Sequence, residues 1–315
     1  MSNATTSLTR LAQLPERWRH GAAQQAAAAQ FPLRIPSTFA NRIQWDDGDD
    51  PLLRQVLPTP EEMLPGGSED PVGEQDRRVA GDLIHKYAGR ALLVVTSSCD
   101  IHCRYCFRRH FPYEPAPGRE TRWEAAVTYL TAHPEVSELI LSGGDPLTLS
   151  NRRLARLLEQ LVKVPHLKRL RVHSRTPTVK PGRVDNGLLA WFAKIPWPST
   201  LVLHCNHPAE LGPEAQSALK RLRALPITLL NQAVLLRGVN DDPKVLAELS
   251  ESLFATGVLP YYLHQMDPVA GAGHFAVATD RARQLMDQLR ERLPGYLVPR
   301  LVADPPGRPA KQVLA

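Results

Sequence analysis

Short apolar runs and longer amphipathic stretches alternate along the chain from about residue 88 onward. The short runs are rich in leucine and β-branched residues, which is typical of buried strands. The longer stretches repeat apolar residues every three or four positions, as helices do. The predicted strands are 91–96, 138–143, 169–174, 200–205, 227–236 and 259–265. The predicted helices are 121–133, 151–163, 214–224, 243–257 and 280–293, followed by a strand-like run at 296–303.

This alternation predicts the architecture of the chain. A strand and a helix repeating at intervals of about thirty residues form βαβ units, in which the strands are parallel and the crossover is right-handed. Six such strands predict an α/β fold, a partial (β/α)6 barrel, over residues 85–278. Residues 1–84 are rich in Pro, Gly, Asp and Ala, and they predict a helical or irregular N-terminal extension. Residues 279–315 predict a C-terminal helix, a strand and a tail.

Composition and charge narrow the class of protein. The 315 residues carry a net charge of +6, but Lys and Arg are scattered through the predicted helices, which does not favour nucleic-acid binding. No apolar run approaches the roughly 18 residues that span a bilayer, so a membrane protein is not expected. The N-terminus lacks the basic start and apolar segment of a secretory signal, and we therefore expect a cytoplasmic protein.

Three of the four cysteines lie close together. Cys99, Cys103 and Cys106 form a C-x3-C-x2-C pattern directly after the first predicted strand. Thiolates at this spacing can bind three irons of a 4Fe-4S cluster and leave the fourth iron open to another ligand. Two alternatives remain, a zinc site completed by His102 or His110 and a chance group of buried thiols. The spacing favours the cluster.

Polar residues follow most of the predicted strands. In parallel α/β folds the carboxyl ends of the strands share one mouth, where the active site forms. The second strand opens into Ser-Gly-Gly-Asp-Pro at 142–146, which offers closely spaced backbone N–H groups and a carboxylate, although an ordinary βα turn would look the same. His204 follows the fourth strand, Gln232 lies in the fifth and Asp267 follows the sixth. Cys205 is isolated at a strand end, and we predict it to be a core thiol.

Longer segments of the sequence resemble a known family. They are HKYAGRALLVVTSSCDIHCRYCFRRHFPY at 85–113, the motifs LILSGGDPL, HCNHPAE, NQAVLLRGVND and YYLHQMD, and Lys311. Together they resemble the lysine 2,3-aminomutase family, whose members are radical S-adenosylmethionine (SAM) enzymes that use a 4Fe-4S cluster and pyridoxal phosphate (PLP). The resemblance extends from about residue 31 almost to the end. Within the family, CRYCFRRHFPY is most similar to the bacterial aminomutases that make (R)-β-lysine for elongation factor P.

The resemblance implies roles for individual residues. The three cysteines would hold the cluster, and Lys311 would form an internal aldimine with PLP, which requires an amine that can lose its proton. Arg108 would pair with the substrate carboxylate, while Asp267 and Asp304 would receive the distal ammonium of lysine. The implied ligands of SAM are Tyr105, Ser142, Gly143, Gly144, Asp145, His204 and Gln232. The implied contacts of the PLP phosphate are Lys86, Tyr87 and Arg90.

The resemblance also implies a reaction and its partners. The chain would be an isomerase, an intramolecular aminotransferase that converts L-α-lysine to (R)-β-lysine. A flavodoxin or ferredoxin would donate electrons, and elongation factor P and its lysyl-transferring ligase would use the product. An aminomutase for another amino acid such as glutamate is one alternative, although Asp267 would repel a second carboxylate. The other is a zinc-stabilised protein, not an enzyme, that binds nucleic acid or the translation machinery.

Overall fold

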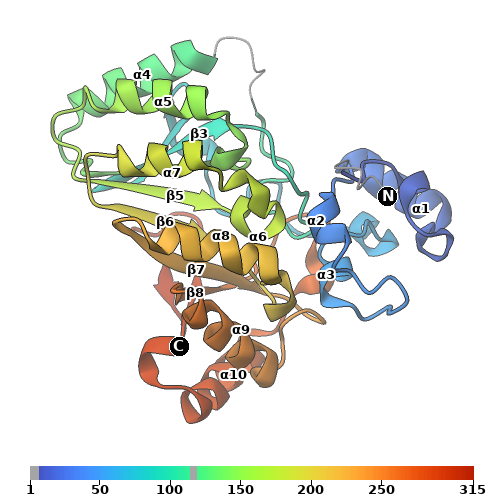
Figure 1. Cartoon of the computed structure of the whole chain (residues 1–315). Helices are drawn as coiled ribbons and strands as arrows, with labels where there is room; N and C mark the ends of the chain where they lie inside the picture. Colours follow the sequence, from blue (N-terminus) through green and yellow to red (C-terminus); the bar gives the residue numbers. More distant parts are fainter. Residues whose placement is uncertain (1–6, 114–118) are drawn as a thin grey trace.

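A ten-stranded sheet forms the centre of the chain in the computed structural model, which describes residues 7–113 and 119–315 (Figure 1). Its strands lie side by side in the order β1 to β10, and those from β3 to β9 are parallel. The parallel strands are β3 (Arg90–Thr96), β4 (Glu138–Gly143), β5 (Arg169–Ser174), β6 (Ser199–Leu203), β7 (Ile227–Leu235), β8 (Leu259–Gln265) and β9 (Arg300–Ala303). The predicted α/β fold with a partial parallel barrel is confirmed, since the six predicted strands correspond to β3 through β8.

Helices cover the outer face of the sheet and bury the main hydrophobic core with it (Figure 1). In α5, Leu154, Leu157 and Leu161 recur at helical spacing and are buried. The strands contribute alternate side chains, so Val172 of β5 joins this core while its neighbour His173 faces the barrel interior. The outer helices are α4 (Arg119–Ala132), α5 (Asn151–Leu161), α7 (Asn186–Ala193), α8 (Pro213–Arg223), α9 (Pro243–Ala255) and α10 (Thr279–Arg292).

The N-terminal region packs beside the barrel and against the loop that follows β3 (Figure 1). Its helices are α1 (Gly21–Gln30), α2 (Ser37–Ala40) and α3 (Pro51–Arg54). Phe39 and Leu52 belong to a second hydrophobic core that also contains Ile101, from the cysteine loop, and Val179, from the short helix α6 (Thr176–Val179). The N-terminal region therefore supports one wall of the barrel mouth.

Short antiparallel strands flank the parallel ones. At one edge β1 (Arg78–Ala80) pairs with β2 (Leu83–Tyr87), and β2 pairs with β3, a feature that the sequence pattern did not predict. At the other edge β10 (Gln312–Val313) pairs with β9, so the tail turns back after Ala303. This return brings Lys311, directly before β10, next to the barrel.

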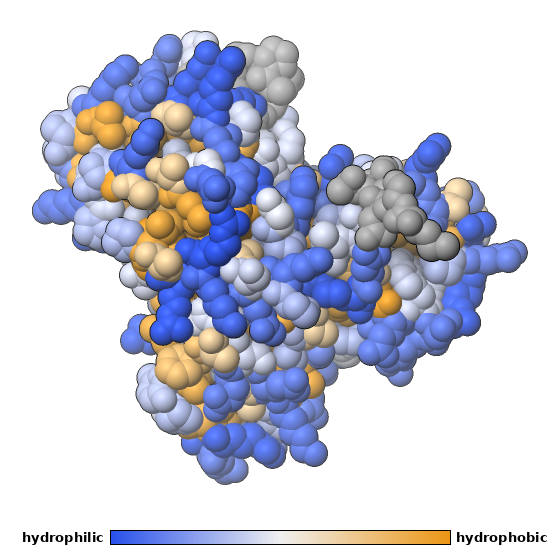
Figure 2. All heavy atoms as spheres, in the orientation of Figure 1, coloured by the Kyte–Doolittle hydropathy of each residue, from blue (hydrophilic) through white to orange (hydrophobic). Residues whose placement is uncertain are grey.

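The surface is mostly hydrophilic on the face drawn in Figure 2, with apolar patches separated by charged residues. None of the helices in the described part of the chain is long and apolar enough to cross a membrane.

Candidate active site

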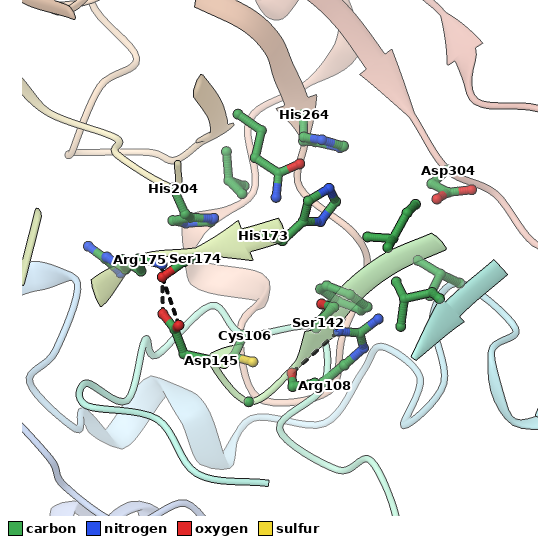
Figure 3. A pocket seen from close by; sticks show the side chains of 18 of the residues that line it. Cys106, Arg108, Ser142, Asp145, His173, Ser174, Arg175, His204, His264 and Asp304 are labelled. Atoms are coloured by element: carbon green, nitrogen blue, oxygen red, sulfur yellow. Dashed lines mark hydrogen bonds between the residues drawn. The ribbon is translucent and has the colours of Figure 1, made fainter. Parts of the chain in front are cut away.

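The carboxyl ends of the parallel strands surround a cavity of about 350 Å³. Figure 3 shows side chains from several strands and loops around this space. Residues far apart in sequence meet here: Lys86 and Asp304, 218 positions apart, are in direct contact. Every residue to which the family resemblance assigns a role lines the cavity, namely Cys99, Cys103, Cys106, Tyr105, Ser142, Gly143, Gly144, Asp145, His204, Gln232, Lys86, Tyr87, Arg90, Arg108, Asp267, Asp304 and Lys311.

The three cysteines of the loop after β3 are free of disulfides. Burial and the charge of neighbouring cysteines raise the pKa of Cys99 well above its usual value and that of Cys106 to about 11. Ionised thiols crowded in this loop therefore need a positively charged partner, and the donor set fits a 4Fe-4S cluster. In the described part of the chain no three His, Cys, Asp or Glu side chains are arranged to hold a metal ion. Cys103 Sγ instead accepts a hydrogen bond from Arg175 Nη1 at 2.7 Å.

Neither histidine of the zinc alternative lines the cavity. His102 Nδ1 is bonded to the carbonyl of Pro32 at 2.7 Å, and His110 Nε2 to that of Ala270 at 3.1 Å. Each imidazole uses one ring nitrogen in this way, and no group of His, Cys, Asp or Glu side chains in the described residues is arranged to hold a metal ion, which argues against a zinc site completed by either histidine. Cys205 is fully buried in the main core, as predicted.

The two glycines after β4 allow close contact with the cysteine loop. Gly144 N donates to Thr96 O at 2.7 Å, and Asp145 N donates to Ser98 O at 2.8 Å. A Cβ on Gly144 would lie 2.2 Å from Ser98 O, and one on Gly143, whose φ is +122°, would lie 2.5 Å from Thr96 O. The N–H groups of Gly144 and Asp145, which the sequence offered as free donors, are already paired. This segment therefore shapes the cysteine loop.

The Asp145 carboxylate fastens the segment that follows β5. It accepts hydrogen bonds from Ser174 Oγ at 2.7 Å and from the backbone N–H groups of Arg175 at 2.7 Å and Thr176 at 2.9 Å (Figure 3). Burial raises the pKa of Asp145, and these donors oppose the rise. Both oxygens are occupied, so this residue fixes the position of Arg175 in the cavity wall.

Tyr105 lies within a buried polar network on the same side. Its hydroxyl is bonded to His204 Nε2 at 3.0 Å, and it accepts a hydrogen bond from Asn206 Nδ2 at 2.6 Å and another from Arg175. Arg175 also forms an ion pair with buried Glu210 at 3.0 Å. Burial and the charge of Arg175 lower the pKa of His204 to about 3, so this imidazole is neutral. The network thus connects this tyrosine of the cysteine loop to the segments that follow β5 and β6.

Arg108 is held by an ion pair that the sequence did not reveal. Its Nε and Nη2 both donate to the Glu74 carboxylate at 2.7 Å. Its Nη1 donates to Ser142 Oγ at 2.8 Å (Figure 3) and to Gly143 O at 3.3 Å. Glu74 occupies a bidentate face of the guanidinium of the kind that a substrate carboxylate would use.

Asp304 connects the C-terminal tail to the edge of the barrel. Its carboxylate accepts hydrogen bonds from Lys311 Nζ at 2.5 Å, Lys86 Nζ at 2.7 Å and Tyr87 Oη at 2.6 Å. Burial alone would raise the pKa of Asp304, but the Lys311 charge and these donors lower it to about 2. The Arg90 guanidinium lies 4.1 Å from the centre of the Tyr87 ring. Cations and a phenol are therefore grouped around the tail.

Asp267 differs from Asp304 although both line the cavity. Its carboxylate has no hydrogen-bond partner among the described residues. Burial raises the pKa of Asp267 to about 7, with the charge of Lys311 opposing the rise and that of Asp304 adding to it. A cationic ligand would stabilise the ionised form of this carboxylate.

Several cavity residues were not nominated from the sequence. Arg171 of β5, Tyr262 and His264 of β8, and Glu74 of the loop before β1 all line the cavity. The strand residues alternate with buried apolar ones, and this period of two could have identified them as facing the barrel interior. Glu74 carries no such signal, because it lies in an irregular segment.

Comparison of the sequence with known proteins identifies a matching family model and several similar proteins. A family described as a 4Fe-4S single cluster domain matches residues 88–171. The chain is 48% identical to an L-lysine 2,3-aminomutase of Escherichia coli over 93% of its own length and 86% of that protein. It is 42% identical to one of Haemophilus influenzae over 92% and 86%, and 35% identical to one of Clostridium subterminale over 87% and 67%.

Among solved structures, SuiB of Streptococcus suis bound to S-adenosylmethionine has a similar fold. The TM-score is 0.50 and the identity 13%, over 69% of this chain and 51% of SuiB. At this identity the likeness concerns the fold alone.

Proposed function

The chain belongs to the lysine 2,3-aminomutase family, and on that premise we propose that it converts L-lysine to (R)-β-lysine with PLP attached to Lys311. As a member of the family it is a radical SAM isomerase that acts on lysine. One observation carries the proposal: the tail strand β10 brings Lys311 into the cavity that the three cysteines also line.

The residues around Lys311 suit an anionic cofactor. Lys86 and Arg90 are cations, and Tyr87 adds a phenol, so together they would hold the phosphate of PLP. Asp304 binds Lys86, Tyr87 and Lys311 at once, and it would keep their side chains in place. When bound, the cluster supplies the electron that cleaves SAM, and PLP supplies a π-system that stabilises the radical during migration of the amino group.

Two residues of the cavity suit the substrate. Arg108 would bind the lysine carboxylate, sharing its guanidinium between this ligand and Glu74. Asp267, which is unpaired among the described residues, would receive the distal ammonium. Displacement of water from the cavity by the bound ligands would strengthen both interactions and keep water from the radical.

The proposal assigns SAM and PLP to different parts of the cavity. We propose that Tyr105, His204 and Gln232 contact SAM together with the glycine motif, whose Ser142 and Gly143 line the cavity directly. The buried network around Tyr105 supports this assignment because it presents a rigid aromatic surface beside the cysteines. Gly144 and Asp145 would contribute by fixing the loop.

The biological setting is also part of the proposal. The similarity of CRYCFRRHFPY to the elongation factor P type supports a role in supplying (R)-β-lysine to that factor and its lysyl-transferring ligase. A flavodoxin or ferredoxin would reduce the cluster in the cytoplasm, where thiols remain reduced. We divide the chain into an N-terminal extension (1–84), a barrel core (85–278) and a tail (279–315).

The test is product identity. Anaerobically reconstituted chain, which should hold about four irons, is reduced and incubated with SAM, PLP and L-lysine, and the products are separated by chiral chromatography. We expect (R)-β-lysine. Turnover of another amino acid in place of lysine, or formation of the opposite enantiomer, would contradict the proposal, and a reaction without added SAM serves as the control.

A further inference from the structure

His173 is a cavity histidine with no assigned partner. It lies near the carboxyl end of β5, and its Nε2 is buried without a hydrogen bond to any described residue. His204, another imidazole of the cavity, is bonded to Tyr105. Native proteins rarely leave a buried polar atom unpaired, because its lost hydration is not replaced. A ligand in the cavity is therefore the expected partner of His173.

The surroundings of His173 indicate what kind of ligand atom it would meet. Burial, together with the charges of Arg171, Arg108 and Lys311, lowers the pKa of His173 well below its usual value. Burial and the Lys311 charge likewise lower the pKa of His264 to about 3. His173 is thus a neutral imidazole with one N–H, surrounded by cations. Such a site favours an anionic or electron-rich acceptor atom.

We propose that His173 Nε2 donates a hydrogen bond to the pyridoxal ring of bound PLP. The inference rests on the proposed function, which attaches PLP to Lys311. The position of His173 supports it, since His173 and Lys311 line the same cavity, whereas His204 is already bonded to Tyr105. A substrate carboxylate offers similar oxygen acceptors, so the experiment must separate the two ligands.

The experiment compares variants of the full chain with a reconstituted cluster. His173→Phe keeps a ring but loses both nitrogens, while His173→Gln places an amide within reach of the Nε2 position. PLP is titrated into each, and its dissociation constant and the absorbance of the bound cofactor are measured. We expect His173→Phe to weaken PLP binding about tenfold, as for loss of one hydrogen bond, and to shift the absorbance. His173→Gln should stay within about threefold of the parent.

A matched control is available in His166→Gln. His166 Nε2 is also buried without a partner, but this residue does not line the cavity, so PLP binding should not change. Iron content and melting temperature report on folding. If His173→Phe does not fold, His173→Asn, which is too short to reach the Nε2 position, provides the same comparison.

The possible results separate the inference from the function on which it rests. If the parent makes β-lysine and His173→Phe binds PLP with unchanged affinity and absorbance, the inference is wrong while the function stands. A raised KM for lysine with unchanged PLP binding would assign His173 to the substrate and also overturn it. If the parent neither binds PLP nor forms β-lysine, the proposed function itself fails.

Discussion

At the scale of single residues, the two aspartates of the cavity have opposite environments. Asp304 accepts hydrogen bonds from Lys86, Tyr87 and Lys311, and its pKa falls to about 2. Asp267 is partly buried and has no hydrogen-bond partner among the described residues, and its pKa rises to about 7. Asp304 is therefore ionised at every physiological pH, whereas Asp267 changes charge near neutrality. Of these two aspartates, only Asp267 is available to a ligand cation, and only its charge changes near neutral pH.

This difference predicts a pH dependence for lysine turnover. Asp267 must be ionised to pair with the distal ammonium, so kcat/KM for lysine should fall about tenfold per pH unit below about pH 7. Above pH 7 the carboxylate is present, and this contribution levels off. Steady-state assays between about pH 5.5 and about pH 8.5 would measure this profile. Asp267→Asn should lower kcat/KM more than tenfold and lose this slope; an unchanged slope in the variant would exclude Asp267 as its source.

The assignment of Lys311 predicts that its removal abolishes the covalent attachment of PLP without loss of the iron-sulfur cluster. Lys311→Ala removes the amine that would bind PLP and one of the partners of Asp304. The variant should lose the covalent adduct, detected by borohydride reduction and peptide mass spectrometry, and retain the iron of the parent. Lys163→Ala is the control, at an exposed lysine whose side chain bonds to Gln160 and to no other described residue. A reduced adduct found on a different lysine of the parent would show that the wrong residue is assigned.

The sequence predicted which residues line the cavity better than it predicted the contacts between them. The resemblance named many of the residues that line the cavity, because they belong to recognisable sequence motifs. It did not name their partners. Glu74 bonds Arg108 across 34 positions, and Arg175 bonds Cys103 across 72, so neither contact follows from local pattern. Such pairs are decided by tertiary packing.

At the scale of elements, the apolar pattern predicted the barrel strands closely. The strands β4, β5 and β8 begin and end at the predicted residues, since their apolar positions are bounded by charged residues and turns. The hairpin strand β1 was missed because three residues carry no measurable period. The helix α7 was missed because its eight residues, Asn-Gly-Leu-Leu-Ala-Trp-Phe-Ala, are mostly apolar and lack a polar face.

The contact between β4 and the cysteine loop gives a prediction for that element. Gly144→Ala would place a Cβ 2.2 Å from Ser98 O, so the loop that carries Cys99 must move. We expect the variant to fold but to hold less than about half the iron of the parent after anaerobic reconstitution, because displaced thiolates cannot reach the same cluster. Gly89→Ala, where a Cβ meets no atom within 4 Å, should hold iron normally. Equal iron in both variants would show that the loop accommodates the methyl group.

At the scale of the whole molecule, one buried carboxylate joins three regions. Glu62, from the N-terminal region, accepts hydrogen bonds from Arg104 at 2.6 Å and Arg109 at 2.7 Å, which both belong to the cysteine loop, and all three side chains are fully buried. Arg109 also donates to Gly271 O at 3.0 Å, in the loop that follows β8 and carries Asp267. The regions that would hold the cluster and the substrate ammonium thus share a single ionic centre.

The position of Glu62 between two buried arginines predicts that the single substitution Glu62→Gln lowers both the stability of the protein and its iron content. Glu62→Gln would leave two buried guanidinium groups without their counter-charge, which costs about 3–5 kcal/mol in comparable buried pairs. We expect the free energy of unfolding, measured with urea, to fall by this amount. The variant should also retain less iron, because the cysteine loop loses its link to the N-terminal region. Glu61→Gln, at the exposed neighbouring residue, should change the free energy by less than about 1 kcal/mol. A Glu62→Gln protein as stable as this control would mean that the arginines find other acceptors. If it lost stability but kept its iron, the centre would support the fold without positioning the cysteines.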